Sequence, residues 1–358
     1  MDQNRNDSLG RADWPLVSVI VVNYNGGARL TSCLGSLMAD GYPARQILIV
    51  DNASTDDSQT VLNNATIRHP EITVLWSARN LGYAGGVNLG LDSARGEFVA
   101  VLNMDITVEP GWLMPLVTFL NEHPGTGAVN PLMTLPDGKR MNAAGQDVHV
   151  TGLGFNRCLG RPVGSVGRTP FRVPGIQGGA FLIRRALLDR IGGMDTNGFL
   201  YHEDVNLSWL LRLMGFDLYC VPASRVCHDY FLTMYPGKLR LLERNRWAML
   251  LAYLHWSSLI VLSPVLLITE SLLWGYCLLR GWEFMRAKMS SYRLALQQWP
   301  QIEQRRQLAE SVRTISDWRL LKDLRWAYAL DQFVTLGRER GNSRRQPVGG
   351  LPHEAGND

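Results

Sequence analysis

The stretch Glu97-Phe-Val-Ala-Val-Leu-Asn-Met-Asp105 decides the fold, because an unbroken apolar run leads directly towards an acidic residue. Residues 98–102 are all apolar, with a glycine just before them and a proline and a glycine soon after, which is typical of a strand buried on both faces of a parallel sheet. Asp105 follows the carboxyl end of that strand. The ligand crevice of an open α/β sheet lies outside its strands' carboxyl ends, so we expect Asp105 to face a ligand, with a turn-capping aspartate as the alternative.

Three further apolar runs precede this stretch, and each ends in polar residues before a helical pattern begins. Strands are predicted at residues 17–22, 47–50 and 72–76, each followed by a helix. Ser54 and Asp57 are spaced like a capping box at the start of the second helix. This repeated order predicts an α/β fold with a doubly wound, mostly parallel central sheet and flanking helices.

The chain beyond this stretch continues the alternation and contains one long irregular segment. Helices are predicted at residues 112–123, 184–191 and 203–214, and strands at residues 129–133, 178–183 and 216–221. Residues 142–175 are rich in glycine, arginine and proline without periodicity. We therefore expect a long irregular loop there, either a lid beside an acceptor or a mobile excursion.

Length and composition limit the class of protein. A chain of 358 residues is long enough for one large α/β domain and an appendage, and its net charge of +4 is too small to indicate nucleic-acid binding. The five cysteines are scattered without a CxxC pair, which argues against a disulfide framework and a zinc site and for a reducing compartment. The polar first 13 residues lack the apolar core of a signal peptide, so the catalytic part is expected in the cytoplasm.

The residues after the first strand exclude two common nucleotide-binding motifs. Asn23-Tyr24-Asn25-Gly26 stands where a Rossmann domain carries GxGxxG, and the sequence contains no Walker A motif. The glycines come later, in residues 80–88. Their backbone N–H groups can meet a diphosphate at a helix N-terminus, or the glycines can serve only a tight turn.

Two adjacent carboxylates, Glu203 and Asp204, lie in the first turn of a predicted helix. Acidic side chains there complement the helix dipole, so a structural role is one interpretation, and a catalytic pair is the other. On a helix the two side chains point about 100° apart, so they cannot face one hydroxyl in the same way. His228 is a further candidate ligand, although a lone histidine is more often structural.

Together these features resemble the inverting family 2 glycosyltransferases of the GT-A fold, and within them the rhamnosyltransferase-like members that build bacterial surface polysaccharides. The resemblance covers about residues 16–250. It rests on the order and spacing of residues 19–26, 51–56, 80–88, 102–105, 178–185 and 202–207.

The resemblance implies a role for each candidate residue. Nucleotide-sugar binding falls to Asn23, Asn25, Asp51, Asn80, Asn88 and Asn103, with Asp51 at the base or ribose. Asp105 is implied as the metal-binding end of an Asp-x-Asp motif, with His228 as a further metal ligand. Asp204 is implied as the catalytic base, with Glu203 beside it. The chain departs from the family at Asn103, Met104 and Asn206, where relatives often have Asp, Pro and Asp.

The chemistry of sugar transfer explains these residue types. A nucleoside diphosphate leaves poorly until its charge is neutralised, and Mg²⁺ or Mn²⁺ bound by oxygen ligands and the phosphates does this. Inversion by single displacement then requires a carboxylate on the opposite face of the sugar to take the acceptor hydroxyl's proton. A divalent cation is therefore the expected cofactor.

The function implied is transfer of a sugar, with rhamnose as one candidate, from a nucleoside-diphosphate donor to a lipid-linked or oligosaccharide acceptor in cell-surface or cell-wall polysaccharide synthesis. A sugar-nucleotide pyrophosphorylase is the rival enzyme, but its glycine-rich, arginine-containing loop after the first strand is missing. Because of Asn103, a membrane-tethered sugar-nucleotide- or glycan-binding protein with little turnover is the other alternative. The sequence is also compatible with a homo-oligomer.

The C-terminal third predicts membrane association. Residues 247–279 are almost wholly apolar, with Pro264 and Glu270 among the few interruptions, and they exceed the roughly 20 residues that span a bilayer. Basic residues flank both ends, so charge does not choose between a single span, a hairpin centred on Pro264 and helices in the membrane plane. A soluble core helix is the remaining alternative. We expect the protein on the cytoplasmic face of the cell membrane.

These observations divide the chain into four parts. We expect a flexible N-terminus at residues 1–15, a GT-A glycosyltransferase domain at 16–240, a helical membrane-associated region at 241–340 and a disordered tail at 341–358. An amphipathic helix is predicted at residues 308–320 within the third part.

Overall fold

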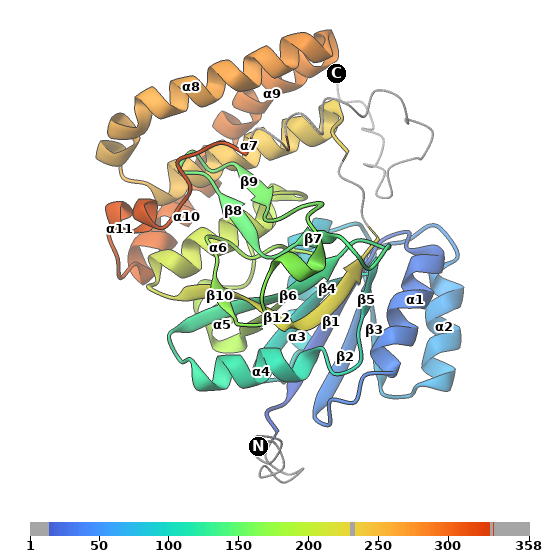
Figure 1. Ribbon diagram of the computed structural model, residues 1–358. Coiled ribbons are helices and arrows are strands. Elements are labelled where there is room, and N and C mark those ends of the chain that lie inside the picture. The colour runs from blue at the N-terminus through green and yellow to red at the C-terminus, as the bar shows by residue number, and fades with distance from the viewer. Residues whose placement is uncertain (1–13, 230–232, 330–331, 333–358) are drawn as a thin grey trace.

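A central mixed sheet organises the protein, and helices cover both of its faces (Figure 1). The computed structural model describes residues 14–229, 233–329 and 332. Its main strands lie in the order β10 (Phe171–Arg172), β12 (Asp217–His228), β6 (Thr126–Thr134), β11 (Ala180–Arg184), β4 (Phe98–Asn103), β1 (Val17–Asn23), β2 (Arg45–Asp51) and β3 (Ile72–Trp76). Strands β3, β2, β1, β4, β6 and β12 run in one direction, and β11 runs antiparallel between β4 and β6. This confirms the predicted mostly parallel sheet.

The apolar run at residues 98–102 forms the middle of the sheet, and each of its side chains is 0% exposed. Alternate side chains of this strand enter two different cores, because successive residues of a strand point to opposite faces. One core packs against α1 (Gly27–Met38), α2 (Ser58–Arg68) and α4 (Leu113–Glu122). The other packs against α3 (Gly82–Ser93), α5 (Arg185–Ile191) and α6 (Glu203–Leu213). Burial on both faces is what the unbroken apolar pattern predicted.

Two local predictions in this domain are wrong. Residues 142–175 are not one irregular loop, because they contain β8 (Gln146–Val148), β9 (Gly154–Asn156), the short helix η1 (Val163–Ser165) and part of β7 (Met141–Ala143), and residues 148–151 are buried. Strands of three residues are too short to show a period in sequence. The predicted Ser54–Asp57 capping box is also absent, since the N-cap residue is Asp57 and its side chain makes no capping hydrogen bond. The Ser54 hydroxyl instead accepts hydrogen bonds from Asn23 Nδ2 and from the Asn25 backbone N–H.

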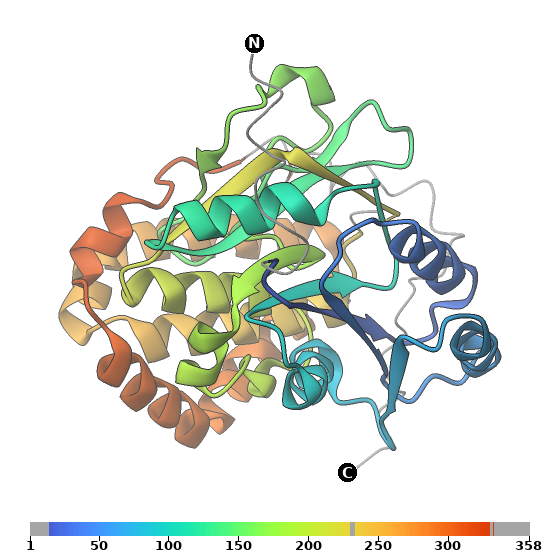
Figure 2. The same cartoon turned by 90° about the horizontal axis from the view of Figure 1, so that it is seen from below.

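Five helices from the C-terminal part pack as a separate layer beside the sheet, away from α1 and α2 (Figure 2). They are α7 (Pro236–Tyr253), α8 (Trp256–Arg280), α9 (Trp282–Gln297), α10 (Trp299–Val312) and α11 (Asp317–Lys322). The prediction of a hairpin centred on Pro264 is wrong, because Pro264 lies inside α8. The apolar segment is instead interrupted at residues 254–255, between α7 and α8. The predicted helix at 308–320 is interrupted between α10 and α11. The predicted tail at 341–358 and residues 1–13 lie outside the described residues.

Candidate functional site

The carboxyl ends of three adjacent strands bring predicted site residues together. Asn23, Asp51 and Asn103 end β1, β2 and β4, and β1 pairs with both of its neighbours in parallel register. Asn23 Nδ2 donates to Asp51 Oδ2 at 2.8 Å, and the backbone N–H of Ser54 donates to Asp51 Oδ1 at 3.0 Å. These bonds hold a buried carboxylate in one orientation at the sheet edge.

Of the remaining asparagines, two extend this edge and one does not. Asn25 Oδ1 accepts from the Thr55 backbone N–H at 2.8 Å, which joins the loops after β1 and β2. Asn80 Oδ1 accepts from the Gly82 backbone N–H at 2.9 Å at the start of α3. Asn88 instead bonds both backbone groups of Met194, at 2.8 and 2.9 Å. The side chain of Asn88 therefore braces α3 against a distant loop and is not brought to the sheet edge.

Asp105 and His228 lie next to each other, although 123 positions separate them in the sequence. Asp105 Oδ1 is 3.4 Å from His228 Nε2, and the two side chains are 12% and 3% exposed. Antiparallel pairing of β5 (Ile106–Val108) with the end of β12 produces this contact. His228 Nδ1 lies 3.1 Å from Asn142 Oδ1, and this contact fixes the orientation of the ring with Nε2 towards Asp105.

A divalent cation fits this arrangement. An imidazole nitrogen and a carboxylate oxygen that face each other are two groups that can bind one cation together. Asn103 Oδ1 and Asp105 Oδ1 are buried and accept no hydrogen bond from any described residue. The described residues contain no group of three or more acidic, histidine or cysteine side chains that could hold a metal alone. Mg²⁺ and Mn²⁺ at nucleotide sites take one or two protein ligands plus phosphate oxygens, which matches this pair.

Asp204 is held by donors from two other elements. Its Oδ2 accepts from the Gly178 backbone N–H at 3.0 Å and from Gln146 Nε2 at 3.1 Å, and its Oδ1 accepts from the Val205 backbone N–H at 2.8 Å. Burial raises the pKa of Asp204, while these hydrogen bonds act in the opposite direction. The carboxylate is therefore oriented and stays basic, which are the two properties a general base requires.

The glycine pair Gly178-Gly179 allows the two halves of the site to approach each other. A Cβ at position 178 would lie 3.2 Å from the Asp204 Cβ, and a Cβ at position 179 would lie 3.0 Å from His228 Cε1. The Gly179 carbonyl also accepts from the Asn103 backbone N–H at 2.9 Å. Side chains at these two positions would occupy the space between the candidate base and the candidate metal ligands.

Glu203 differs from its neighbour in its surroundings. Its Oε2 is buried and has no hydrogen-bond partner among the described residues. Burial, and then the adjacent Asp204 carboxylate, raise the pKa of Glu203 to about 8. Glu203 is therefore largely protonated at neutral pH and is a poor base there, whereas Asp204 has three donors that favour its ionised form.

The loop before these carboxylates has an unusual backbone. Phe199, Tyr201 and His202 have backbone φ values of 56°, 69° and 74°, which residues other than glycine rarely adopt. Asn245 of α7 holds the loop, because its Nδ2 contacts the carbonyls of Gly198, Leu200 and Tyr201 at 3.1, 3.1 and 2.7 Å. A helix of the C-terminal layer thus fixes the conformation that delivers Glu203 and Asp204.

A cavity of about 310 Å³ joins the site to the C-terminal helices. Asn103, Asp204 and His228 line this cavity, and so do Lys238 and Leu242 of α7 and Leu273 of α8. The Lys238 amine lies 5.0 Å from the centre of the Tyr201 ring. One space therefore contains a candidate base, a candidate metal ligand and an apolar wall beside α8.

Sequence reasoning missed three residues that position this site: Asn142, Gln146 and Asn245. None stands in a recognisable motif, and the first two lie in or beside the segment predicted to be a loop. The sequence marks the Gly178-Gly179 pair as the start of a strand and as part of the motif at residues 178–185, without assigning it a role in the site. No sequence signal places these residues next to partners that lie 26 to 86 positions away.

Comparison with known sequences gives three matches. The family described as "Glycosyl transferase family 2" matches residues 18–192. The N-acetylglucosaminyl-diphospho-decaprenol L-rhamnosyltransferase of Mycobacterium tuberculosis (strain H37Rv) is 30% identical over 235 residues, which are 60% of this chain and 76% of that protein. The O-antigen biosynthesis protein RfbC of Myxococcus xanthus is 26% identical over 251 residues, covering 68% of this chain and 19% of that protein.

Solved structures share the fold. A crystal structure of GalNAc-T7 with UDP, GalNAc and Mn²⁺ superposes with a TM-score of 0.64 at 18% identity, covering 87% of this chain and 56% of the other. The mannosyltransferase PcManGT from Pyrobaculum calidifontis, in complex with GDP-Man and Mn²⁺, gives a TM-score of 0.51 at 18% identity, covering 91% of this chain and 85% of the other. The chain thus spans little more than half the length of the GalNAc-T7 structure. These likenesses confirm the expected GT-A fold.

Proposed function

This chain belongs to glycosyl transferase family 2 and is a glycosyltransferase, and on that premise we propose that it moves a sugar from a nucleoside-diphosphate donor to a hydroxyl of a lipid-linked acceptor, with inversion. The observation that carries the proposal is that Asp204 shares one cavity with Asn103 and His228. A candidate base and a candidate diphosphate site that share one space suit single displacement.

Asp204 performs the proton transfer in this proposal. Its carboxylate accepts the proton of the acceptor hydroxyl as that oxygen forms a bond to the anomeric carbon of the donor sugar. The bond between that carbon and the diphosphate oxygen breaks, and the nucleoside diphosphate leaves with the bonding electrons. Gln146 and the Gly178 N–H keep the carboxylate directed into the cavity throughout.

Asp105 and His228 would hold Mg²⁺ or Mn²⁺, and Asn103 offers a further oxygen. When bound, the cation supplies positive charge to the leaving diphosphate. Two solved structures with this fold contain Mn²⁺ with a nucleotide or nucleotide sugar, which supports the proposal. We propose that Asp51 and Asn23, which bond to each other at the neighbouring strand ends, bind the nucleoside.

The proposed acceptor and pathway follow the similarity to the mycobacterial protein, whose name specifies an L-rhamnosyl donor group and a decaprenol diphosphate acceptor. We propose rhamnose as the first donor sugar to test, and a polyprenyl-diphosphate sugar as the acceptor. The product would be an intermediate of cell-surface or cell-wall polysaccharide. We also propose that the enzyme acts at the cytoplasmic face of the cell membrane, where a lipid acceptor would be within reach.

The decisive experiment measures sugar transfer by the purified full chain. Donors are dTDP-, UDP- and GDP-sugars, and the acceptor is a short polyprenyl-diphosphate N-acetylglucosamine, with Mg²⁺ or Mn²⁺ and with EDTA. We expect cation-dependent release of nucleoside diphosphate coupled to acceptor glycosylation, and loss of both in Asp204→Asn. Donor binding without turnover by the wild-type protein for every donor would instead favour a sugar-nucleotide-binding protein.

A further inference from the structure

Helix α8 has two faces with different surroundings. Leu262, Leu266, Thr269, Leu273 and Cys277 form a buried stripe, because their spacing of three and four residues keeps them on one side of a helix. The other side, here called the outer face of α8, is exposed and apolar. It consists of Trp256, Ile260, Val261, Leu267, Ile268, Leu272, Leu278 and Leu279.

The outer face of α8 is unusual for a protein surface. Among its described residues, no aspartate, glutamate, lysine or arginine is exposed between residues 256 and 279. Leu267 is 67% exposed and Leu279 is 77% exposed. An uncharged apolar surface that runs along a helix of 25 residues marks a binding surface for a membrane or another protein.

The neighbouring helix α9, which packs beside α8, indicates a lipid surface. Its exposed stripe is Trp282, Arg286, Met289, Arg293 and Leu296, again spaced by three and four residues. Alternating apolar and cationic side chains with tryptophan are typical of helices that lie at the headgroup level of anionic bilayers.

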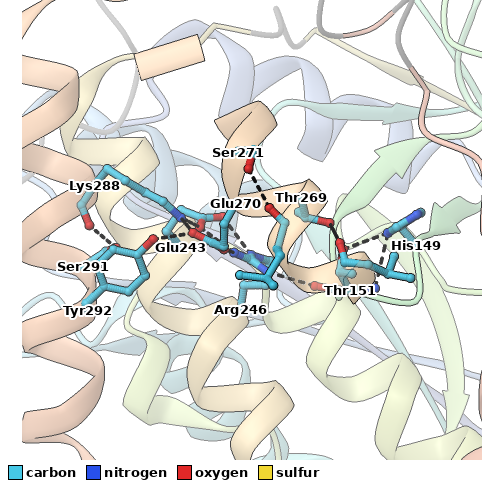
Figure 3. Close-up of polar contacts among 12 residues, drawn as sticks. His149, Thr151, Glu243, Arg246, Thr269, Glu270, Ser271, Lys288, Ser291 and Tyr292 are labelled. Carbon is cyan, nitrogen blue, oxygen red and sulfur yellow. Dashed lines mark hydrogen bonds and ion pairs between the residues drawn. The ribbon is translucent and has the colours of Figure 1, made fainter. Parts of the chain in front are cut away.

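A buried ionic cluster ties α8 to the helices below it (Figure 3). Glu270, near the middle of α8, contacts Arg246 of α7 and lies 2.7 Å from Lys288 of α9. Arg246 also binds Glu243 of α7 at 2.7 and 2.8 Å, and Lys288 contacts the same carboxylate. Burial would raise the pKa of Glu243, but Arg246 and Lys288 lower it to about 2, so this carboxylate is ionised.

A second polar contact lies one residue away on the same side of α8. Thr269 Oγ1 is 3.1 Å from Thr151 Oγ1, and Thr151 belongs to the segment beside the catalytic domain's sheet. If α8 crossed a bilayer, it would have to leave both contacts, and Arg246 and Lys288 would lose a charged partner in a buried setting. The cluster therefore holds α8 flat against the domain.

We propose that α8 is an in-plane docking helix, which inserts its outer face into one leaflet of a lipid bilayer without crossing it. The choice of a bilayer as the occupant rests on the proposed use of a lipid-linked acceptor. It is supported by the active-site cavity, because Leu273 on the inner side of α8 lines the same space as Asp204. Docking by the outer face would place that cavity directly beside the lipid that carries the acceptor.

Vesicle binding tests the surface. The double variant Leu267→Glu/Leu272→Glu places two charges on the outer face, and Ile67→Glu, at a residue that is 78% exposed on α2, is the matched control. With vesicles of phosphatidylethanolamine and phosphatidylglycerol, we expect the double variant to bind at least tenfold more weakly and Ile67→Glu to bind like wild type. Equal binding by all three proteins would overturn the proposal.

Labelling of cysteines tests the topology. Ser257→Cys and Leu279→Cys place thiols near the two ends of α8, and the partly exposed native Cys158 reports the side of the catalytic domain. An impermeant maleimide is applied to inside-out and right-side-out membrane vesicles. We expect both ends to be labelled only from the side that labels Cys158. Labelling of one end from the opposite side would show a span and overturn the proposal.

Two controls separate this proposal from the proposed function. The double variant should keep wild-type turnover with a water-soluble acceptor that lacks the polyprenyl chain, so a loss of binding with intact turnover supports docking alone. The mass of the wild-type protein in detergent-free solution tests a second copy as the occupant. A dimer that the double variant dissociates, together with no vesicle binding by wild type, would replace the bilayer with a protein partner.

Discussion

At the scale of single residues, the adjacent carboxylates Glu203 and Asp204 differ in the hydrogen bonds that they accept. Asp204 receives three, from Gly178, Gln146 and Val205, whereas Glu203 Oε2 receives none from the described residues. We predict that Asp204→Asn lowers kcat by roughly 10² to 10⁴-fold with little change in donor affinity, because a positioned base contributes about that factor. Steady-state kinetics and donor titration measure the two quantities. A smaller loss in Asp204→Asn than in Glu203→Gln would reverse the roles.

Glu203 should also make stability depend on pH. Its pKa of about 8 in the folded protein exceeds the ordinary value of 4.5, so the folded state binds the proton more tightly than the unfolded chain. Its contribution is complete below pH 4.5 and is lost as the pH rises towards 8. We predict that the free energy of unfolding of wild type falls, relative to Glu203→Gln, by at least about 1.4 kcal/mol between these limits. Urea unfolding in EDTA measures the free energy of unfolding of both proteins at each pH. If the two free energies changed with pH in the same way, the prediction would be contradicted.

Asp105 provides a test of the cation site. Asp105→Asn removes a charge but keeps the shape of the side chain, so the contact of 3.4 Å with His228 can persist without its carboxylate. We predict that the variant folds normally but needs at least about tenfold more Mn²⁺ for half-maximal turnover, since a hard cation loses an anionic oxygen ligand. Circular dichroism checks the fold, and a Mn²⁺ titration of turnover checks the site. An unchanged Mn²⁺ requirement would remove Asp105 from the metal site.

At the scale of elements, the loop at residues 199–202 and helix α7 act together. The loop's three positive φ angles each cost about 1–3 kcal/mol, so the conformation persists only if surrounding groups hold it. Asn245, which is 8% exposed, shares the two hydrogens of its Nδ2 among three carbonyl oxygens of the loop and the residue before it. The catalytic carboxylates therefore depend on a helix outside the sheet.

We predict that Asn245→Ala lowers kcat by roughly 10²-fold while the donor KM changes little, because a shift of about 1 Å in a catalytic group can cause such a loss. Asn64→Ala on the exposed side of α2 is the matched control and should behave like wild type. Thermal unfolding separates a local shift from a general loss of structure. If kcat falls only in proportion to the folded fraction, Asn245 has no positioning role.

At the scale of the whole molecule, the ionic cluster joins the C-terminal helices into one layer. Lys288 is 0% exposed and contacts both Glu243 and Glu270. We predict that Lys288→Met destabilises the protein by about 3–5 kcal/mol, because two buried carboxylates then share a single arginine. Lys322→Met, at an exposed lysine of α11, is the control. Urea unfolding measures both variants, and equal stabilities would show that the cluster does not hold the layer together.

The local pattern of the sequence determined the main elements of this protein. The apolar run at 98–102 predicted a strand buried on both faces, and the periodic helices and the order of strands predicted the sheet, because these signals arise from neighbours along the chain. The short strands within residues 142–175 escaped prediction, since three residues cannot display a period. The candidate carboxylates were predicted from motifs. A motif indicates the chemical role of a residue but not its distance from residues elsewhere in the chain.

Only the tertiary structure decided which residues meet. It placed Asp105 beside His228 through the pairing of β5 with β12, brought Gln146 to Asp204, and left Asn88 as a brace. It also showed that α8 has a buried side with polar contacts at Thr269 and Glu270 and an apolar outer face, where hydropathy alone allowed a span, a hairpin or a helix in the membrane plane. Local sequence patterns report the preference of a segment for burial. Which partner buries it depends on contacts between residues far apart in the chain, and these exist only once the chain has folded.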